Sequence, residues 1–443
     1  MPEVTKVEPW SKARLGEVSG SLLIGEGATI QGEGEPPRVK VEGSVVCKGD
    51  CTFLCSLEAL KLDTKGGDIN IDGDLSIETT VRVKRGSLMV RGNAKAEIFE
   101  IDKKLLVEKN LRGEEIRVGG TLEVGGEVKA ETIDVGGVFT ARDRLKARKV
   151  KVGGKFIAEK ELELEELIVG GKAIVAGGKI ISINVGGGFE ARGPITFEDL
   201  DVGGSVKLGE GSEGGEINVG GALKAKNGLK FDKIDVGGLV SIEGNAEGGE
   251  INVGGVLKVT GSLKFDKLDV GGKASVSGRA EGEEVEVGGA IVVGEDLILK
   301  ENLDVGGTCR VRGLLKAESI KIGGGVEANL IKAEDLVKAG GYIRTSKGVK
   351  AREVRIGRRG EIKGLVVAEE VLVEERARVE DIYADEIVME ERSRARSLHG
   401  RRIYLERRCR VLGEVEYVET LEKETDVEIG LEKKVEEIKK PEI

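Results

Sequence analysis

The chain has 443 residues, of which 34% are charged, and its formal net charge is -10. Because both signs of charge are intermixed along it, the surface is not that of a nucleic-acid-binding protein. Glycine occurs 69 times but proline only 6 times, which excludes collagen and proline-rich disorder. Aromatic residues make up 3%, so valine, isoleucine, leucine and alanine must form the core. Abundant Glu, Lys and Arg with few Met and Cys indicate a thermophilic source.

The two ends of the chain carry no visible targeting signal. Residues 1–6 contain no basic region followed by an apolar run, so we expect no secretory signal. No stretch approaches about 18 uncharged apolar residues, the length that spans a membrane, and neither end has a lipidation motif. We therefore predict a cytoplasmic protein without a transmembrane segment; association with a membrane surface stays open.

The beginning of the chain is irregular. Residues 1–20 include the only tryptophan, Trp10, and match nothing later in the chain, so we predict an N-terminal tail or cap. In residues 21–100 the apolar positions recur at uneven intervals, which predicts irregular coils of a repeat with insertions at their corners. The positions that we expect to stack are Ile24, Val41, Leu62, Val83 and Ile101.

Residues 101–358 repeat one short motif, namely an apolar residue, any residue and then Val-Gly-Gly. Its valines recur about 17 residues apart, with one step shorter and one step longer than the rest, and such a fixed short repeat indicates a solenoid. A solenoid grows in one dimension without dividing into separate cores. The valines are Val118, Val135, Val152, Val169, Val185, Val202, Val219, Val236, Val253, Val270, Val287 and Val305.

Each repeat contains three short apolar runs. In the coil that starts at Val253, apolar residues alternate around Val259, Phe265 and Val270. Such alternation marks strands with one buried face. We therefore predict an all-β fold, a single-stranded parallel β-helix (β-solenoid) with three short strands per coil of about 17 residues and right-handed coiling. About 22 or 23 coils would make a rod on the order of 110 Å long.

The Gly-Gly pairs recur at one corner of the predicted coil. We attribute them to positive φ, which glycine adopts at little steric cost. A phosphate-binding loop is excluded because no Lys-Ser or Lys-Thr ends any of these pairs and no helix follows them. The glycines are therefore a structural feature.

The repeat changes after Ile356. The Gly-Gly corner disappears, but apolar runs continue at a slightly shorter, regular step at Val371, Ile387 and Ile403, so residues 359–418 are predicted to form further coils. From residue 419 the pattern gives way to Glu and Lys. Val435 and Ile438 lie about one helical turn apart. We predict that residues 419–443 are a charged C-terminal tail or cap, with a short capping helix as one form.

Residues 360–389 carry a family resemblance. They include Gly360-Glu-Ile-Lys-Gly and Val371-Leu-Val-Glu-Glu, and they resemble the bactofilins, cytoskeletal proteins with repeats of the type Gly-x-Ile-x-Ala-x-x-Val-x-Val. Residues 20–34 and 39–45 look similar. The resemblance implies a right-handed, three-faced β-helix that polymerises end to end without nucleotide, as a scaffold for other proteins. This chain departs from the family in its length, its Val-Gly-Gly corner and its lack of an apolar membrane-targeting tail.

Cys47, Cys51 and Cys55 form the stretch that looks most like a chemical site. Three thiols four residues apart could share a metal ion or form a disulfide. Zinc ribbons, however, need a second pair of ligands, and none follows nearby. Residues i and i+4 of a strand share a face, so we interpret all three as core cysteines and predict no metal site. Cys309 and Cys409 are isolated.

His399 is the only histidine, and we expect it at a corner that faces water. Hexapeptide acyltransferases, which are also β-helices, use a histidine base at a subunit cleft. Without a second histidine, no acid–base or nucleophile–histidine pair of the usual kind is available. A polysaccharide lyase is disfavoured because such enzymes usually offer aromatic platforms, and this chain has four Tyr and one Trp. We predict no enzyme, no catalytic residue and no cofactor.

The residue directly before the valine of each Val-Gly-Gly motif is expected to point outward, and in many repeats it is Asp, Glu or Asn. Stacked coils would turn it into a ladder of carboxylates and amides about 4.8 Å apart. Such a ladder could bind cations or the basic residues of a partner, or it could simply keep one face solvated. The positions are Asn184, Asp201, Asn218, Asp235, Asn252, Asp269, Glu286 and Asp304.

The predicted function is structural. A β-helix ends in unpaired backbone groups that must be capped or paired with another chain. End-to-end pairing would make a nucleotide-independent filament whose first partner is a copy of the same chain, with other proteins as further partners. The alternative is a non-polymerising module that offers a flat face to a protein or a cation. We expect the two ends of the chain to distinguish the filament from the binding module, because folded caps would block polymerisation.

Overall fold

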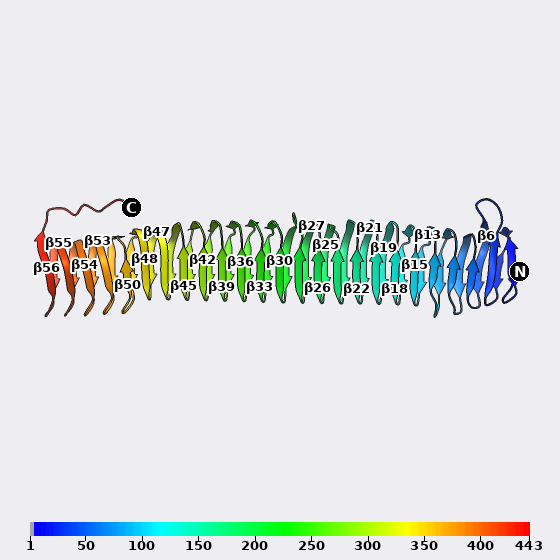
Figure 1. Cartoon of the computed structure of the whole chain (residues 1–443), viewed down its shortest axis with the longest axis horizontal. Helices are drawn as coiled ribbons and strands as arrows, with labels where there is room; N and C mark the ends of the chain where they lie inside the picture. The colour runs from blue at the N-terminus through cyan, green and yellow to red at the C-terminus, as the bar shows by residue number, and fades with distance from the viewer. Residues whose placement is uncertain (1–3) are drawn as a thin grey trace. The chain divides into compact units, whose positions relative to one another are not determined.

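The computed structural model describes residues 4–443 as β structure and irregular segments, with no helix among them (Figure 1). The fold is a parallel β-solenoid of about 25 turns with ~17 residues per turn, which confirms the predicted fold class. The chain divides into two compact units, Met1–Leu223 and Lys224–Ile443, which we describe separately. Right-handed coiling stays a prediction. In residues 4–443 we find no helix that could cross a membrane.

Each turn contributes one strand to each of three parallel faces. In unit 1, β17 (Glu115–Val118) lies on the first face, β18 (Thr121–Val124) on the second and β16 (Leu111–Arg112) on the third. Strands of the same face pair in register across turns, as β17 does with the end of β19 (Val128–Val135). In unit 2, β35 (Glu250–Val253), β36 (Val256–Val259) and β37 (Leu263–Lys264) repeat this arrangement.

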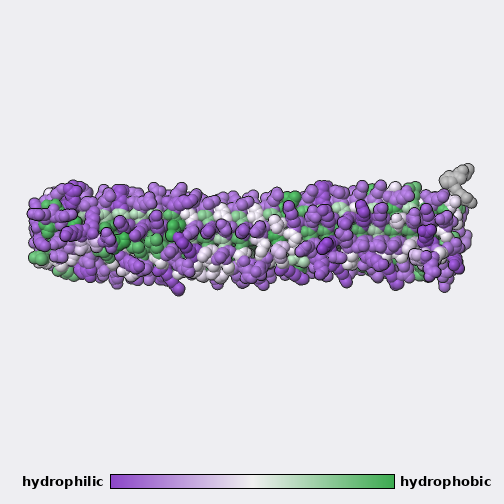
Figure 2. All heavy atoms as spheres, turned by 90° about the horizontal axis from the view of Figure 1, so that it is seen from above, coloured by the Kyte–Doolittle hydropathy of each residue, from purple (hydrophilic) through white to green (hydrophobic). Residues whose placement is uncertain are grey.

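The core consists of columns of inward side chains, one residue per turn. Val118 and Val135 are 2% and 0% exposed, as expected for the valine column. Phe139 and Phe156 lie one above the other with ring centroids 5.3 Å apart, and both are fully buried. Charged side chains cover most of the outer surface, as Figure 2 shows for one face. The alternation read from the sequence therefore places apolar residues inside, as predicted.

The Gly-Gly corners lie where the sequence predicts them, but positive φ is the wrong reason for them. No glycine of a Val-Gly-Gly motif has positive φ in the described residues. Instead, the backbones of successive turns approach closely at this corner. A Cβ atom added to Gly136 would lie 2.2 Å from the carbonyl oxygen of Gly119, and one added to Gly153 would lie 2.3 Å from that of Gly136. The glycines are needed because a neighbouring carbonyl occupies the place of a side chain.

The stacking predicted for residues 21–100 is partly wrong. The first-face column passes from Ile24 to Cys47 and Thr64, not through Val41 and Leu62. Val41 belongs to the third face, where it pairs with Val18. The step from residue 24 to residue 47 is long because residues 33–38 form a small excursion, closed by an antiparallel bridge between its ends. Because of this insertion, the spacing of apolar residues in the sequence does not show which residues stack on one another.

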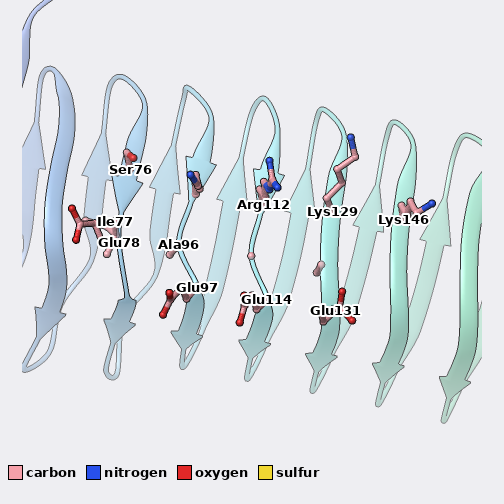
Figure 3. Close-up of a pocket in the computed structure, with 13 residues that line it drawn as sticks. Ser76, Ile77, Glu78, Ala96, Glu97, Arg112, Glu114, Lys129, Glu131 and Lys146 are labelled. Atoms are coloured by element: carbon pink, nitrogen blue, oxygen red, sulfur yellow. The ribbon is translucent and has the colours of Figure 1, made fainter.

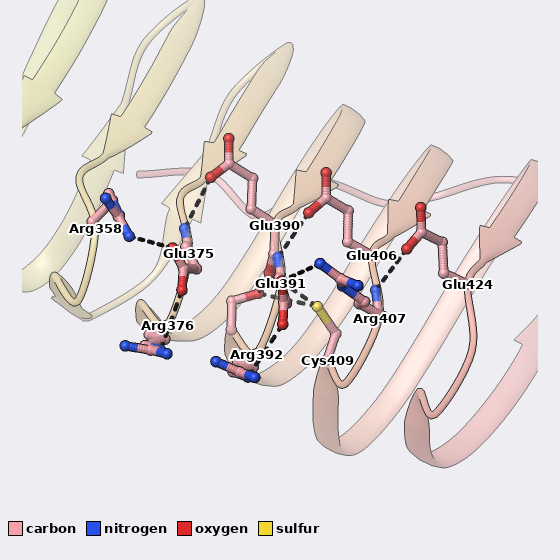
Figure 4. A network of polar contacts seen from close by, with 11 residues as sticks. Arg358, Glu375, Arg376, Glu390, Glu391, Arg392, Glu406, Arg407, Cys409 and Glu424 are labelled. Atoms are coloured by element: carbon pink, nitrogen blue, oxygen red, sulfur yellow. Dashed lines mark hydrogen bonds and ion pairs between the residues drawn. The ribbon is translucent and has the colours of Figure 1, made fainter.

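After Ile356 the corners use a different construction (Figure 4). Arg376, Arg392 and Arg408 have φ of 62°, 60° and 61°, the left-handed conformation that non-glycine residues rarely adopt. A glutamate of the following turn supports each corner. The Oε2 atom of Glu390 accepts a hydrogen bond from the backbone N–H of Glu375 at 3.0 Å, and the same contact recurs further along. The predicted coils of residues 359–418 are present, with Val371, Ile387 and Ile403 in register.

Both ends of the chain differ from the prediction of a tail or cap. Residues 4–18 form the first turn through β1 (Val4–Val7), β2 (Lys12–Leu15) and β3 (Glu17–Val18). The last turn is made by the end of β55 (Arg410–Lys423) and by β56 (Glu428–Lys434). These extra turns raise the number of coils above the predicted one. The sequence pattern missed the last turn because charged residues such as Glu432 stand at inward positions of its strands.

The last residues, 435–443, form no helix, so the capping-helix form of the prediction is wrong. They run back along the side of unit 2 (Figure 1). The ammonium of Lys440 donates hydrogen bonds to the carbonyl of Ala368 at 2.9 Å and to Asp385 Oδ2 at 3.0 Å. These contacts hold the segment on the side of the solenoid and not across the edge of β56.

Candidate functional site

The three clustered cysteines are buried and free, as the interpretation of core cysteines requires. They do not share one strand, however. Cys47 ends β6 (Arg38–Cys47), Cys51 begins β7 (Cys51–Phe53) and Cys55 lies at the next corner. A hydrogen bond with Cys51, together with burial, holds the pKa of the Cys47 thiol well above its usual range. Burial raises the pKa of Cys55 to about 11 and that of Cys309 to about 12.

We expect these thiols to resist alkylation in the folded protein. At pH 8 an unfolded cysteine, with a pKa of about 8.5, is partly thiolate, whereas Cys55 and Cys309 stay protonated. Iodoacetamide labelling followed by mass spectrometry should be more than about a hundredfold slower in the native state than in denaturant. Rapid native labelling of either residue would contradict this account of their burial.

His399 lies inside the structure, so the prediction of a corner that faces water is wrong. It belongs to β54 (Arg394–Leu405) and is 5% exposed. Its ring stacks on Tyr383 of the preceding turn, with centroids 4.2 Å apart. On the other side, its Nδ1 atom lies 2.9 Å from Oε2 of Glu416. The histidine is therefore stacked between side chains of the turns before and after it. Several nearby residues in the sequence are polar, and they do not show that the stacking buries it.

His399, Glu414 and Glu416 are the one group of potential metal ligands found among residues 4–443, with ligand atoms within 4.8 Å of one another. A lysine already occupies this group. The ammonium of Lys433 lies 3.0 Å from Oε1 of Glu416 and is the main reason why the pKa of Glu416 is lowered, with His399 as the second. The arrangement is explained as a structural stack in which Lys433 neutralises Glu416.

The predicted ladder is present within each unit. In unit 1, Asn184 pairs with Asp201, and Asp201 pairs with Asn218. In unit 2, Asp235, Asn252, Asp269, Glu286 and Asp304 follow one another in register. Two of these strands begin with a lysine, Lys233 and Lys267, which pair beside the ladder with Glu250 at 3.5 Å and with Glu284 at 3.4 Å. The ladder is thus a mostly exposed column of carboxylates and amides with ion pairs beside it.

A groove of about 680 Å³ on the third face of unit 1 was not predicted (Figure 3). Two rows of charged side chains line it, and small residues form its floor. We call them the basic row, which consists of Lys95, Arg112, Lys129 and Lys146, and the acidic row, which consists of Glu78, Glu97, Glu114 and Glu131. The sequence does contain the signal, because Lys-Ala-Glu, Arg-Gly-Glu and Lys-Ala-Glu begin at residues 95, 112 and 129.

Comparison of the chain with protein-family models, with curated proteins and with solved structures finds no match. The resemblance to bactofilins therefore rests on the repeat read from the sequence. What is established is a β-solenoid protein.

Proposed function

We propose that this chain is a non-enzymatic structural protein, related to the bactofilins, that assembles end to end with copies of itself into filaments without nucleotide. One observation carries the proposal, namely that both terminal turns present strand edges with no partner among residues 4–443. At the N-terminal end β1 pairs only with β4 (Ser21–Ile24), and at the C-terminal end β56 pairs only with β55. Unpaired edges of this kind are templates for another chain.

The N-terminal edge offers an apolar surface. Val7, Ala13 and Val18 continue the core columns into the first turn, where Val7 and Val18 are only 8% and 5% exposed, so the accessible apolar residues of this edge are its outer ones. Trp10 packs against Gly27 of the second turn and is still 76% exposed, and Val4 is 49% exposed. Burial of such residues against a second copy would add an apolar contribution to the backbone pairing.

The C-terminal edge is different, because charged residues occupy two of its core positions, beside the apolar Leu421 and Ile429. Lys423 lies in register above Leu405, and Glu432 lies in register above Val415. The two side chains pair at 2.6 Å across the end of the core, and they are 45% and 38% exposed. Covering this pair with another copy would desolvate both charges, which weakens the junction. The pair therefore limits the length of the filaments that the proposal predicts.

The double variant Lys423→Leu/Glu432→Val is expected to lengthen filaments and to lower the concentration needed for assembly. Replacement of a buried ion pair by apolar residues is worth about 1–4 kcal/mol, or about fivefold or more in that concentration. Conversely, Ala13→Glu should reduce assembly, because it places a charge at the N-terminal edge. Sedimentation and negative-stain electron microscopy of nucleotide-free protein measure both effects.

The matched control is Lys267→Leu/Glu284→Val, which removes an ion pair of similar exposure, 48% and 39%, from the side of unit 2. It should leave filament length unchanged. Monodisperse particles at high concentration for the natural chain and for all three variants would overturn the proposal. In that case the binding-module alternative, supported by the acidic ladder of unit 2, becomes the better account.

A further inference from the structure

The groove places two rows of opposite charge side by side, and each row stacks like charge on like charge. Lys95 pairs in register with Arg112, and Arg112 pairs in register with Lys129. In the acidic row, the backbone N–H of Glu114 donates to the carbonyl of Glu97, so these two glutamates occupy successive turns. Like charges at neighbouring positions on adjacent strands destabilise a sheet.

At several other places the same chain puts opposite charges in register. Lys149 pairs with Glu166 at 2.8 Å, and Lys233 pairs with Glu250 at 3.5 Å. In the centre of the groove this compensation is missing. Across residues 4–443, Lys95, Arg112, Glu97 and Glu114 have no ion pair. The two rows do not pair with each other across the floor of the groove. At its far end Lys129 pairs with Glu127 at 3.1 Å, Lys146 with Glu163 at 2.9 Å and Glu131 with Arg148 at 3.8 Å, so only the four central charges are left for a partner.

The floor of the groove allows a close approach. Between the rows lie the small residues Ala96, Gly113 and Ala130, and Ala147 continues this column before the larger Leu164, while Ile77 closes it at the other end. Figure 3 shows Ala96 between the basic row and the acidic row. The groove is thus a shallow trough with positive charge along one side and negative charge along the other, and both sides run in the direction in which the turns stack.

We propose that this groove binds the same groove of a second copy, side by side and with both solenoids pointing in the same direction. A two-fold rotation about an axis along the groove brings the acidic row of one copy over the basic row of the other. A two-fold rotation about an axis across the groove would instead place each row on a row of its own sign. The pattern of charges therefore selects the parallel pair and rejects the antiparallel one.

Each turn of the groove supplies two reciprocal ion pairs to this contact. Lys95 of one copy faces Glu97 of the other, Arg112 faces Glu114, and the reverse pairs form by symmetry. Because the surface is small and exposed, the contact is weak for one pair of chains and sensitive to salt. The inference does not rest on end-to-end assembly, since it concerns the side of unit 1.

Charge reversal gives a test in which the variants check one another. Lys95→Glu/Arg112→Glu makes both sides of the groove acidic, and Glu97→Lys/Glu114→Lys makes both sides basic. Each variant alone should lose the contact, whereas an equimolar mixture of the two should restore it, because each then meets its opposite. Lys258→Glu/Lys264→Glu is the matched control, which changes the net charge equally on exposed positions of unit 2.

The readout is a cross-link between introduced thiols. Ala130→Cys, placed in every background, puts one thiol at the axis of the proposed pair, and a bis-maleimide that spans about 10 Å reaches across facing sheets. Lys207→Cys on another exposed position serves as the background level. We expect a covalent dimer at about 0.02 M salt, at least fivefold above that level, and its loss at about 0.5 M salt.

Two results would overturn the inference. The first is a yield for Ala130→Cys that does not exceed that for Lys207→Cys. The second is a yield that the charge reversals leave unchanged, which would assign the contact to other residues. The cross-linked dimer is detected on a gel, whereas filaments are detected by sedimentation and microscopy. Loss of filaments in the Ala13→Glu variant can therefore be told apart from loss of the groove contact.

Discussion

Alanine in place of Gly136 is expected to lower the free energy of unfolding of unit 1 by about 3 kcal/mol or more. The added Cβ atom would lie 2.2 Å from the carbonyl oxygen of Gly119. That atom belongs to the backbone, and the amide of Gly136 donates a 2.9 Å hydrogen bond to Val118 at the same corner. Neither turn can move away without breaking the ladder of hydrogen bonds. Urea or thermal unfolding followed by circular dichroism measures the loss.

Gly188→Ala is the matched control for this prediction. Gly188 follows a Gly-Gly corner directly, in β26 (Gly188–Ala191), and its nearest contact would be the carbonyl oxygen of Ser205 at 3.4 Å. This is an ordinary contact, and the residue does not have positive φ. We expect its stability to change by less than about 1 kcal/mol. An equal loss in both variants would show that the close approach is not the reason for the Gly-Gly corner.

Truncation of Phe156 to alanine is expected to cost about 3–5 kcal/mol, the usual range for a fully buried phenylalanine. Phe156 is 0% exposed and lies in register between Phe139 below and Ala173 above. With alanine at both positions, two successive turns would lack the volume that fills the centre. The core is narrow, so neighbouring side chains have little room to close the cavity. Ile157→Ala, which removes an outward side chain of the same strand, should cost less than about 1 kcal/mol.

Both losses should be local, because each turn of a solenoid contacts only its neighbours. Hydrogen exchange measured by mass spectrometry is the appropriate second measurement. In the Phe156→Ala variant, amide protection should fall in β20 (Val138–Ala141), β22 (Lys155–Ala158) and β24 (Lys172–Val175), and it should be unchanged in unit 2. Uniform loss over all turns would contradict this local account.

The sequence by itself determined the architecture. The constant step from Val118 to Val135 and onward, together with the alternation around Val259, was enough for a parallel solenoid with three strands per turn, because inward positions must be apolar at that period. The burial of Cys47 and Cys51 was also predictable, since both lie in apolar runs. The terminal turns escaped prediction because charged residues such as Lys423 and Glu432 stand at inward positions where nothing lies above them.

Only the tertiary structure decided how the turns meet. It assigned the glycines to a close approach of carbonyl groups in successive turns, and it placed His399 between Tyr383 and Glu416. It also brought Lys95 beside Arg112, which belong to different turns of the chain. The physical reason is the same in each case. A repeat fixes which residues point inward, whereas contacts between turns depend on the register and on the length of every corner.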